Sequence, residues 1–144
     1  MTDSLMNQLF GSGLIIAAPA SGSGKTLFTL GCLRYLRNAG VRIASGKIGP
    51  DYIDPVFHSV ASGSPCVNID PWAMRRSTFQ CITKNLAASG DQIIVEGVMG
   101  LFDGVGLKKE PSYGSSATVA ADLGWPIVLI IDAATIAHPN ALVH

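Results

Sequence analysis

The chain has 144 residues, which is enough for one domain or part of one. Its ten Lys and Arg residues balance its ten Asp and Glu residues. This neutrality argues against a nucleic-acid partner, whose binding surface would show as clustered basic residues. No apolar run is long enough to cross a membrane and no signal peptide is evident, so we expect a cytoplasmic protein.

Strand-like and helix-like segments alternate along the chain. Residues 1–12 are predicted to be a leader or disordered tail. Strands are predicted at 13–18, 41–47, 92–96 and 126–132, and helices at 25–39, 55–62, 77–88 and 116–123. Strands separated by helices predict an α/β fold with a parallel sheet flanked by helices. The segment after residue 132 does not complete a further crossover, so we expect a domain over 13–144 that is incomplete at its C-terminus.

The cysteine and histidine residues predict no metal site. The three cysteines lack metal-ligand spacing, and their odd number fits a reducing compartment. Cys32 lies in the first predicted helix and is expected to be a small buried side chain. The histidines at 58, 138 and 144 are scattered, and none is predicted to be a ligand. Charged residues make up only 14% of the chain, against roughly 25% in ordinary soluble domains. We therefore expect more chain or a partner to cover part of the surface.

Residues 18–26, Ala-Pro-Ala-Ser-Gly-Ser-Gly-Lys-Thr, are the most informative stretch. They connect a predicted strand to a predicted helix, which is the setting of a phosphate-binding P-loop. Lys25 would reach the β- and γ-phosphates of ATP, and the Thr26 hydroxyl would hold Mg²⁺. Cofactor contacts are also expected from the small residues of the loop: Ser21, Gly22, Ser23 and Gly24. Pro19 stands where the strict pattern has glycine, so a Gly/Ser-rich turn before a helix is the alternative.

Four acids follow the ends of predicted strands, where a parallel sheet places its ligands. Asp51 and Asp54 follow the second strand, Glu96 ends the third, and Asp103 comes shortly after it. Carboxylates beside a triphosphate suit Mg²⁺, and a lone buried Glu96 would be costly without a partner. The alternatives are a turn residue for Asp51, a helix N-cap for Asp54 and a solvated loop charge for Asp103. Lys47 is either a second phosphate ligand or a surface lysine.

Four ordered segments, at 17–26, 47–58, 68–72 and 95–104, together resemble the cobyrinate a,c-diamide synthase family, with its relatives for hydrogenobyrinate and nickel-sirohydrochlorin. The resemblance implies a dethiobiotin-synthetase-like P-loop NTPase domain. It also implies ATP- and Mg²⁺-dependent amidation of the a and c carboxylates of a corrin-type tetrapyrrole through an acyl-phosphate. Ammonia would come from glutamine through a C-terminal glutaminase domain that these 144 residues lack.

The same resemblance implies roles for single residues. Thr26, Asp54 and Glu96 are similar to the family's metal site, and Tyr52 would lie on the substrate side. The residues that resemble its catalytic acids are Asp51, Asp54, Glu96 and Asp103. A P-loop regulatory or partitioning-type ATPase is the first alternative, although Ala20 stands where such proteins have a signature lysine. An inactive piece that needs the rest of its chain is the second, and a homodimer is left open.

Overall fold

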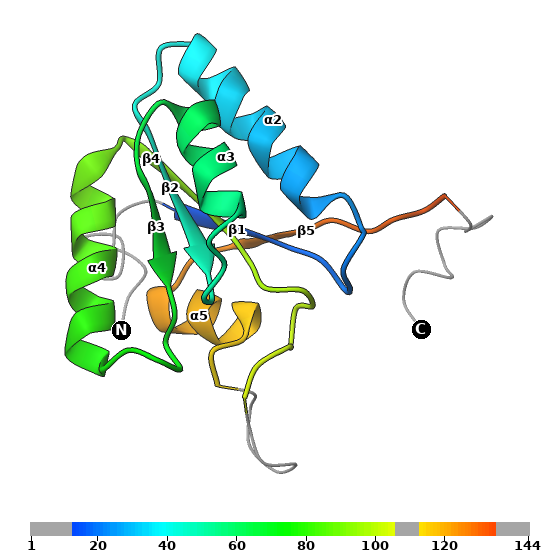
Figure 1. Ribbon diagram of the computed structural model, residues 1–144, viewed down its shortest axis with the longest axis vertical. Coiled ribbons are helices and arrows are strands. Elements are labelled where there is room, and N and C mark those ends of the chain that lie inside the picture. The colour runs from blue at the N-terminus through cyan, green and yellow to red at the C-terminus, as the bar shows by residue number, and fades with distance from the viewer. Residues whose placement is uncertain (1–12, 106–112, 135–144) are drawn as a thin grey trace.

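The structure is a computed structural model that describes residues 13–105 and 113–134. Five parallel strands form one sheet in the order β3-β2-β4-β1-β5 (Figure 1). The chain runs through β1 (Gly13–Ala17), α2 (Lys25–Asn38), β2 (Ile43–Ile48), α3 (Asp54–Ser62), β3 (Cys66–Ile69), α4 (Arg76–Ser89), β4 (Gln92–Glu96), α5 (Ser116–Leu123) and β5 (Ile127–Leu129). The predicted α/β fold, a P-loop type with a parallel sheet between helices, is confirmed.

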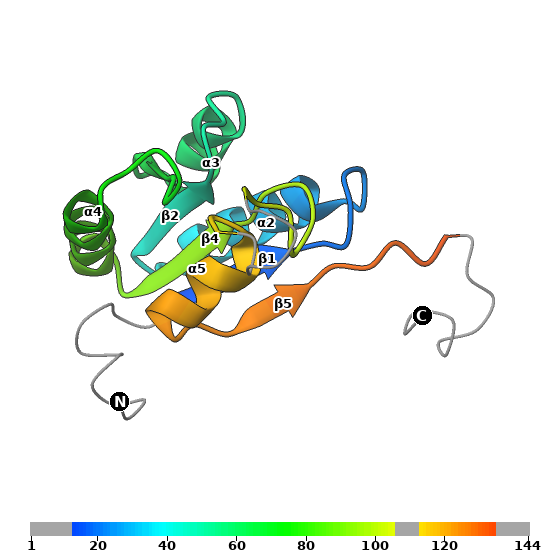
Figure 2. The same cartoon turned by 90° about the horizontal axis from the view of Figure 1, so that it is seen from below.

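Helices cover both faces of the sheet (Figure 2). Helices α2 and α3 pack on one face, where Leu33 and Ala61 join a core cluster with Ile16 of β1. Helices α4 and α5 pack on the other face, where the larger core cluster contains Ile15. Successive residues of a strand point to opposite faces, so β1 supplies both cores. This double burial explains why its central residues are all apolar.

One strand escapes the sequence prediction. Strand β3 is only four residues long and includes a polar residue, Asn68, so it lacks the apolar run that marks β4. It pairs with β2 from Ser45↔Cys66 to Ile48↔Ile69, and this pairing makes it the edge of the sheet. The prediction of four strands is therefore wrong. Strand β5 also ends at Leu129, three residues earlier than predicted.

The strand order brings the predicted functional segments to one edge of the sheet. In the parallel pairing, Lys47 of β2 lies opposite Glu96 of β4, and Glu96 lies opposite Ile16 of β1. The P-loop segment follows β1 directly, so it meets both of these strand ends. Among the described residues, no helix has the length and apolar character needed to cross a membrane. The predicted leader at 1–12 and the residues after 134 lie outside the described ranges.

Candidate nucleotide site

The loop between β1 and α2 has the backbone that a phosphate-binding loop needs. Gly22 and Gly24 have φ values of 82° and 83°, which L side chains rarely adopt. The Ser23 hydroxyl donates to the carbonyl of Ala20 at 2.9 Å and thereby closes the turn. Helix α2 then begins at Lys25 with no side-chain hydrogen bond at its N-cap. Its first backbone N–H groups are available for an anion, which the helix dipole also favours.

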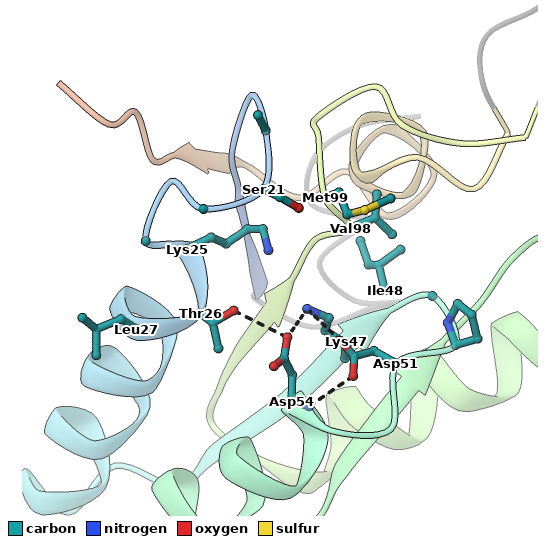
Figure 3. A pocket seen from close by; sticks show the side chains of 15 residues that line it. Ser21, Lys25, Thr26, Leu27, Lys47, Ile48, Asp51, Asp54, Val98 and Met99 are labelled. Carbon is teal, nitrogen blue, oxygen red and sulfur yellow. Dashed lines mark hydrogen bonds and ion pairs between the residues drawn. The ribbon is translucent and has the colours of Figure 1, made fainter. Parts of the chain in front are cut away.

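A pocket of about 530 Å³ opens beside this loop. Loop and α2 residues line one side, and the end of β2 with its following loop lines the other. Val98 and Met99, which follow β4, complete the wall. Figure 3 shows Lys25 and Thr26 on one side of this space, with Lys47 and Asp54 on the other. The volume falls within the ordinary range for small-molecule sites.

Glu96 is the hub of the charged side chains at this edge of the sheet. Its side chain is fully buried. The Oε1 atom accepts hydrogen bonds from Thr26 Oγ1 at 2.7 Å, Lys25 Nζ at 2.9 Å and Lys47 Nζ at 3.0 Å. The Oε2 atom lies 2.7 Å from His58 Nε2. Burial alone would raise the pKa of Glu96, but these hydrogen bonds and the Lys47 charge outweigh it and hold the pKa far below its usual range.

Lys47 is not a surface lysine, because its side chain is only 6% exposed. Its ammonium contacts Asp54 Oδ2 at 2.6 Å and Glu96 Oε1 at 3.0 Å, and Asp51 Oδ2 lies 3.6 Å away. Burial by itself lowers the pKa of this lysine, yet the hydrogen bond to Asp54 and the charge of Glu96 raise it overall. Lys47 therefore stays cationic inside the pocket. Its predicted contact with phosphate remains a prediction.

Asp51 and Asp54 make different kinds of contact at the start of α3. The N-cap of α3 is Ile53, and Asp54 is already helical, so the alternative of a helix N-cap for Asp54 is wrong. Instead, Asp51 Oδ1 accepts from the backbone N–H of Ile53 at 2.8 Å and of Asp54 at 3.2 Å. Burial raises the pKa of Asp51, but these backbone donors and Lys47 lower it overall. The Asp54 side chain does not cap the helix and instead points into the pocket, where it contacts Lys47 (Figure 3).

The β3 strand fixes the loop that carries these acids. The Asn68 amide donates to the carbonyl of Gly49 at 3.0 Å and to that of Asp51 at 2.5 Å. The backbone N–H of Gly49 also donates to the carbonyl of Ile69 at 2.9 Å. These three bonds tie the turn after β2 to the edge strand. The short strand that the sequence analysis missed therefore positions Asp51.

Three oxygens converge where the sequence predicts Mg²⁺. Thr26 Oγ1 lies 2.7 Å from Glu96 Oε1 and 3.5 Å from Asp54 Oδ2. One hydroxyl and two carboxylates are hard donors of the kind Mg²⁺ takes together with phosphate oxygens and waters. Within 13–105 and 113–134, no group of three or more His, Cys, Asp or Glu side chains is arranged to hold a metal alone. The donor set thus fits a Mg²⁺ that arrives with a nucleotide.

Some predicted residues do not join this cluster. Asp103 is exposed in the loop after β4 and does not line the pocket, and its backbone N–H donates to the carbonyl of Gly100 at 3.2 Å. Tyr52 is 82% exposed and is not among the residues that line the pocket. Ser23 is likewise absent from the pocket wall. Cys32 is half-buried and packs against the core around Leu33, close to its expected place.

His58 is the site residue that the sequence analysis missed. It is fully buried and contacts Glu96 directly. A signal was available, because His58 follows Asp54 by four residues in α3, and side chains with this spacing share a face of a helix. The prediction that His58 is no metal ligand stays a prediction, since the contact seen here is with the carboxylate of Glu96.

Comparison with known proteins gives the chain a family. No family model matches it. Over 130 residues, or 90% of the chain, it is 50% identical to hydrogenobyrinate a,c-diamide synthases from Rhizobium meliloti and Brucella anthropi. Over 120 residues it is also 50% identical to the protein of that name from Rhodobacter capsulatus. The chain matches a piece of the hydrogenobyrinate a,c-diamide synthase family. It spans 27–29% of the length of these relatives, and the predicted resemblance is confirmed.

Proposed function

We propose that this chain carries the ATP- and Mg²⁺-binding site of an enzyme that amidates carboxylates of a corrin-type tetrapyrrole. The name of the relatives supports the substrate class. The observation that supports this proposal most directly is that Lys25, Thr26 and Lys47 all contact one buried carboxylate, that of Glu96. This cluster lies beside the N-terminus of α2, which has no side-chain cap. Such a site neutralises and orients a triphosphate, which is the main requirement of phosphoryl transfer.

Each residue has a defined task in this proposal. The N-terminus of α2 and Lys25 bind the β- and γ-phosphates, and Lys47 neutralises charge on the γ-phosphate from the opposite wall. Thr26, Asp54 and Glu96 would hold Mg²⁺, which supplies charge neutralisation for the phosphates when bound. Lys47 is held as a cation by Asp54 and Glu96, so it would meet the phosphate as a fixed positive charge.

The chemistry then proceeds in two displacements. A substrate carboxylate oxygen attacks the γ-phosphorus, the bond to the ADP oxygen breaks, and an acyl-phosphate forms. Ammonia released from glutamine elsewhere in the enzyme attacks the acyl carbon, loses a proton and expels inorganic phosphate. The substrate carboxylate is itself the nucleophile, so the chain needs to supply no nucleophilic side chain.

Isothermal titration calorimetry with Mg–ATP tests the nucleotide site. The wild-type chain should bind, whereas Lys25→Ala should bind at least about 10-fold more weakly, since a charge-assisted phosphate contact is lost. Lys84→Ala is the matched control, because Lys84 is exposed on α4, away from the pocket lining. Equal binding by wild type and Lys25→Ala would contradict the site. Nucleotide-dependent dimerisation in light scattering, without amidation by the longer enzyme, would favour the dimerising ATPase instead.

A further inference from the structure

His58 is buried between two partners, one on each ring nitrogen. Its Nε2 lies 2.7 Å from Glu96 Oε2, and its Nδ1 lies 3.5 Å from Cys66 Sγ. The histidine comes from α3, the carboxylate from the end of β4 and the thiol from the start of β3. A line of three side chains thus runs from the edge strand of the sheet to the hub of the charged cluster.

The two partners together define the tautomer of His58. Glu96 Oε1 accepts from two ammonium groups and a hydroxyl, the surroundings of an ionised carboxylate, and such a carboxylate only accepts hydrogen bonds. His58 Nε2 must therefore carry the proton and donate it. Burial raises the pKa of the Cys66 thiol to about 11, so the thiol keeps its proton and can donate to Nδ1. Both contacts favour the same Nε2–H form of the ring.

The contact decides which oxygen of Glu96 faces the pocket. His58 holds Oε2, and Oε1 is the atom that meets Thr26, Lys25 and Lys47. The terminal torsion of a glutamate is broad and roughly two-fold, so a carboxylate without a fixed partner samples other orientations. Because His58 holds Oε2 in place, the orientation of Oε1 is fixed as well.

We propose that His58 is a positioning residue that aims the Glu96 carboxylate into the nucleotide site, with Cys66 as a second partner that holds the ring from its Nδ1 side. This role rests on the proposed Mg–ATP function. Carboxylates and histidines behind a metal site commonly act in this way, and their loss weakens metal binding or activity by about 10- to 100-fold. His58 is not among the residues that line the pocket, and it is not one of the predicted phosphate contacts.

Calorimetry in the presence and absence of Mg²⁺ separates positioning from simple structural support. His58→Ala should weaken Mg–ATP binding by about 10-fold and metal-free ATP binding much less, because the metal would contact Glu96 directly, whereas Lys25 and Lys47 keep their own charge for the phosphates. His58→Gln should recover most of the loss, since its carboxamide offers an N–H donor at a similar reach. Val60→Ala is the control, because Val60 is on the same helix and 62% exposed.

Nitrogen-15 NMR of the histidines gives a readout that needs no nucleotide. Wild-type His58 should show the Nε2–H tautomer, and Cys66→Ala should shift the Nδ1 resonance while the contact with Glu96 keeps the proton on Nε2. If His58→Ala fails to fold, Cys66→Ala carries the calorimetric test, with a smaller expected loss of Mg–ATP affinity. A wild-type Nδ1–H tautomer, or equal Mg–ATP binding by wild type and the variants, would overturn the positioning role and leave the proposed function standing. A wild-type chain that binds no Mg–ATP would overturn the proposed function and this role with it.

Discussion

Replacing Glu96 by glutamine tests how far the charged cluster depends on its central carboxylate. The substitution keeps the size and shape of the side chain and removes its negative charge. In the native protein that charge faces two buried ammonium groups, of Lys25 and Lys47, whose side chains are 11% and 6% exposed. After the substitution both lysines lie in a buried environment beside a neutral amide. His58 and Thr26 also lose an ionised acceptor.

The expected magnitude follows from these contacts. Removing one partner of a buried ion pair destabilises a protein by about 3–5 kcal/mol, because the other charge stays buried. Lys47 keeps Asp54 at 2.6 Å, which offsets part of the loss. We therefore expect Glu96→Gln to lower the free energy of unfolding by about 3 kcal/mol. For a domain of this size that corresponds to a fall of roughly 10 °C in the midpoint of thermal unfolding.

Circular dichroism during heating, at neutral pH and without nucleotide, measures this change. Asp91→Asn is the matched control, because it also converts an acid to its amide. Asp91 pairs with Arg42 on the surface, where the two side chains are 57% and 69% exposed. Solvent screens such pairs, so the control should change the midpoint little. The reasoning would be refuted if the two variants unfolded at the same temperature.

Three further predictions concern pH and packing. The pKa values of Glu96 and Asp51 are lowered in the folded protein, so the stability they confer is present above about pH 4.5 and is lost as the pH falls below it. Midpoints of thermal unfolding between pH 7 and pH 3 should therefore be flat and then drop, and a profile without the drop would contradict the assigned contacts. Gly13→Ala should destabilise the fold by about 1–3 kcal/mol in urea titrations, because its Cβ would lie 2.7 Å from the ring of Trp125. Gly31→Ala, inside α2 with open space around it, should instead stabilise the protein by up to about 1 kcal/mol in the same assay, and a loss there would show strain at that position.

The regular elements were predictable where one local pattern dominated. Strand β4 and helix α5 have the bounds that the sequence predicts, since an apolar run defines the first and an N-cap serine with a final glycine brackets the second. Strand β3 lacks such a pattern, because it forms only through pairing with β2, which lies 18 or more residues earlier in the chain. Pairing partners of this kind are a property of the whole sheet. A four-residue strand with one polar member therefore escapes a local analysis.

The site shows the same division between local and distant causes. The sequence predicted a functional role for Glu96, because a carboxylate at the end of an apolar strand needs polar or charged partners in any fold that buries it. Its actual partners come from three other elements, and the i, i+4 spacing of Asp54 and His58 places both on one face of α3 without showing that this face meets Glu96. The capping alternative for Asp54 failed because α3 begins at Asp54 itself, one residue earlier than predicted, and Asp51 accepts the hydrogen bonds at the start of this helix. Sequence thus located the acids, and only the sheet order showed which of them meet.

A double-mutant cycle on Lys47 and Glu96 separates stability from function in the cluster. Each single variant, Lys47→Met and Glu96→Gln, leaves charged neighbours with fewer partners, so each should destabilise the fold. The double variant has neither the Lys47 nor the Glu96 charge, so neither one is left buried without the other. Its loss in free energy of unfolding, measured in urea, should therefore be at least about 1 kcal/mol smaller than the sum of the two single losses. Additive losses would show that the 3.0 Å contact carries no coupling. Because well-packed apolar residues often stabilise a protein as much as a buried ion pair does, stability alone does not account for two lysines around this carboxylate. Their charge is what a triphosphate site requires, so the double variant should remain folded and lose Mg–ATP binding.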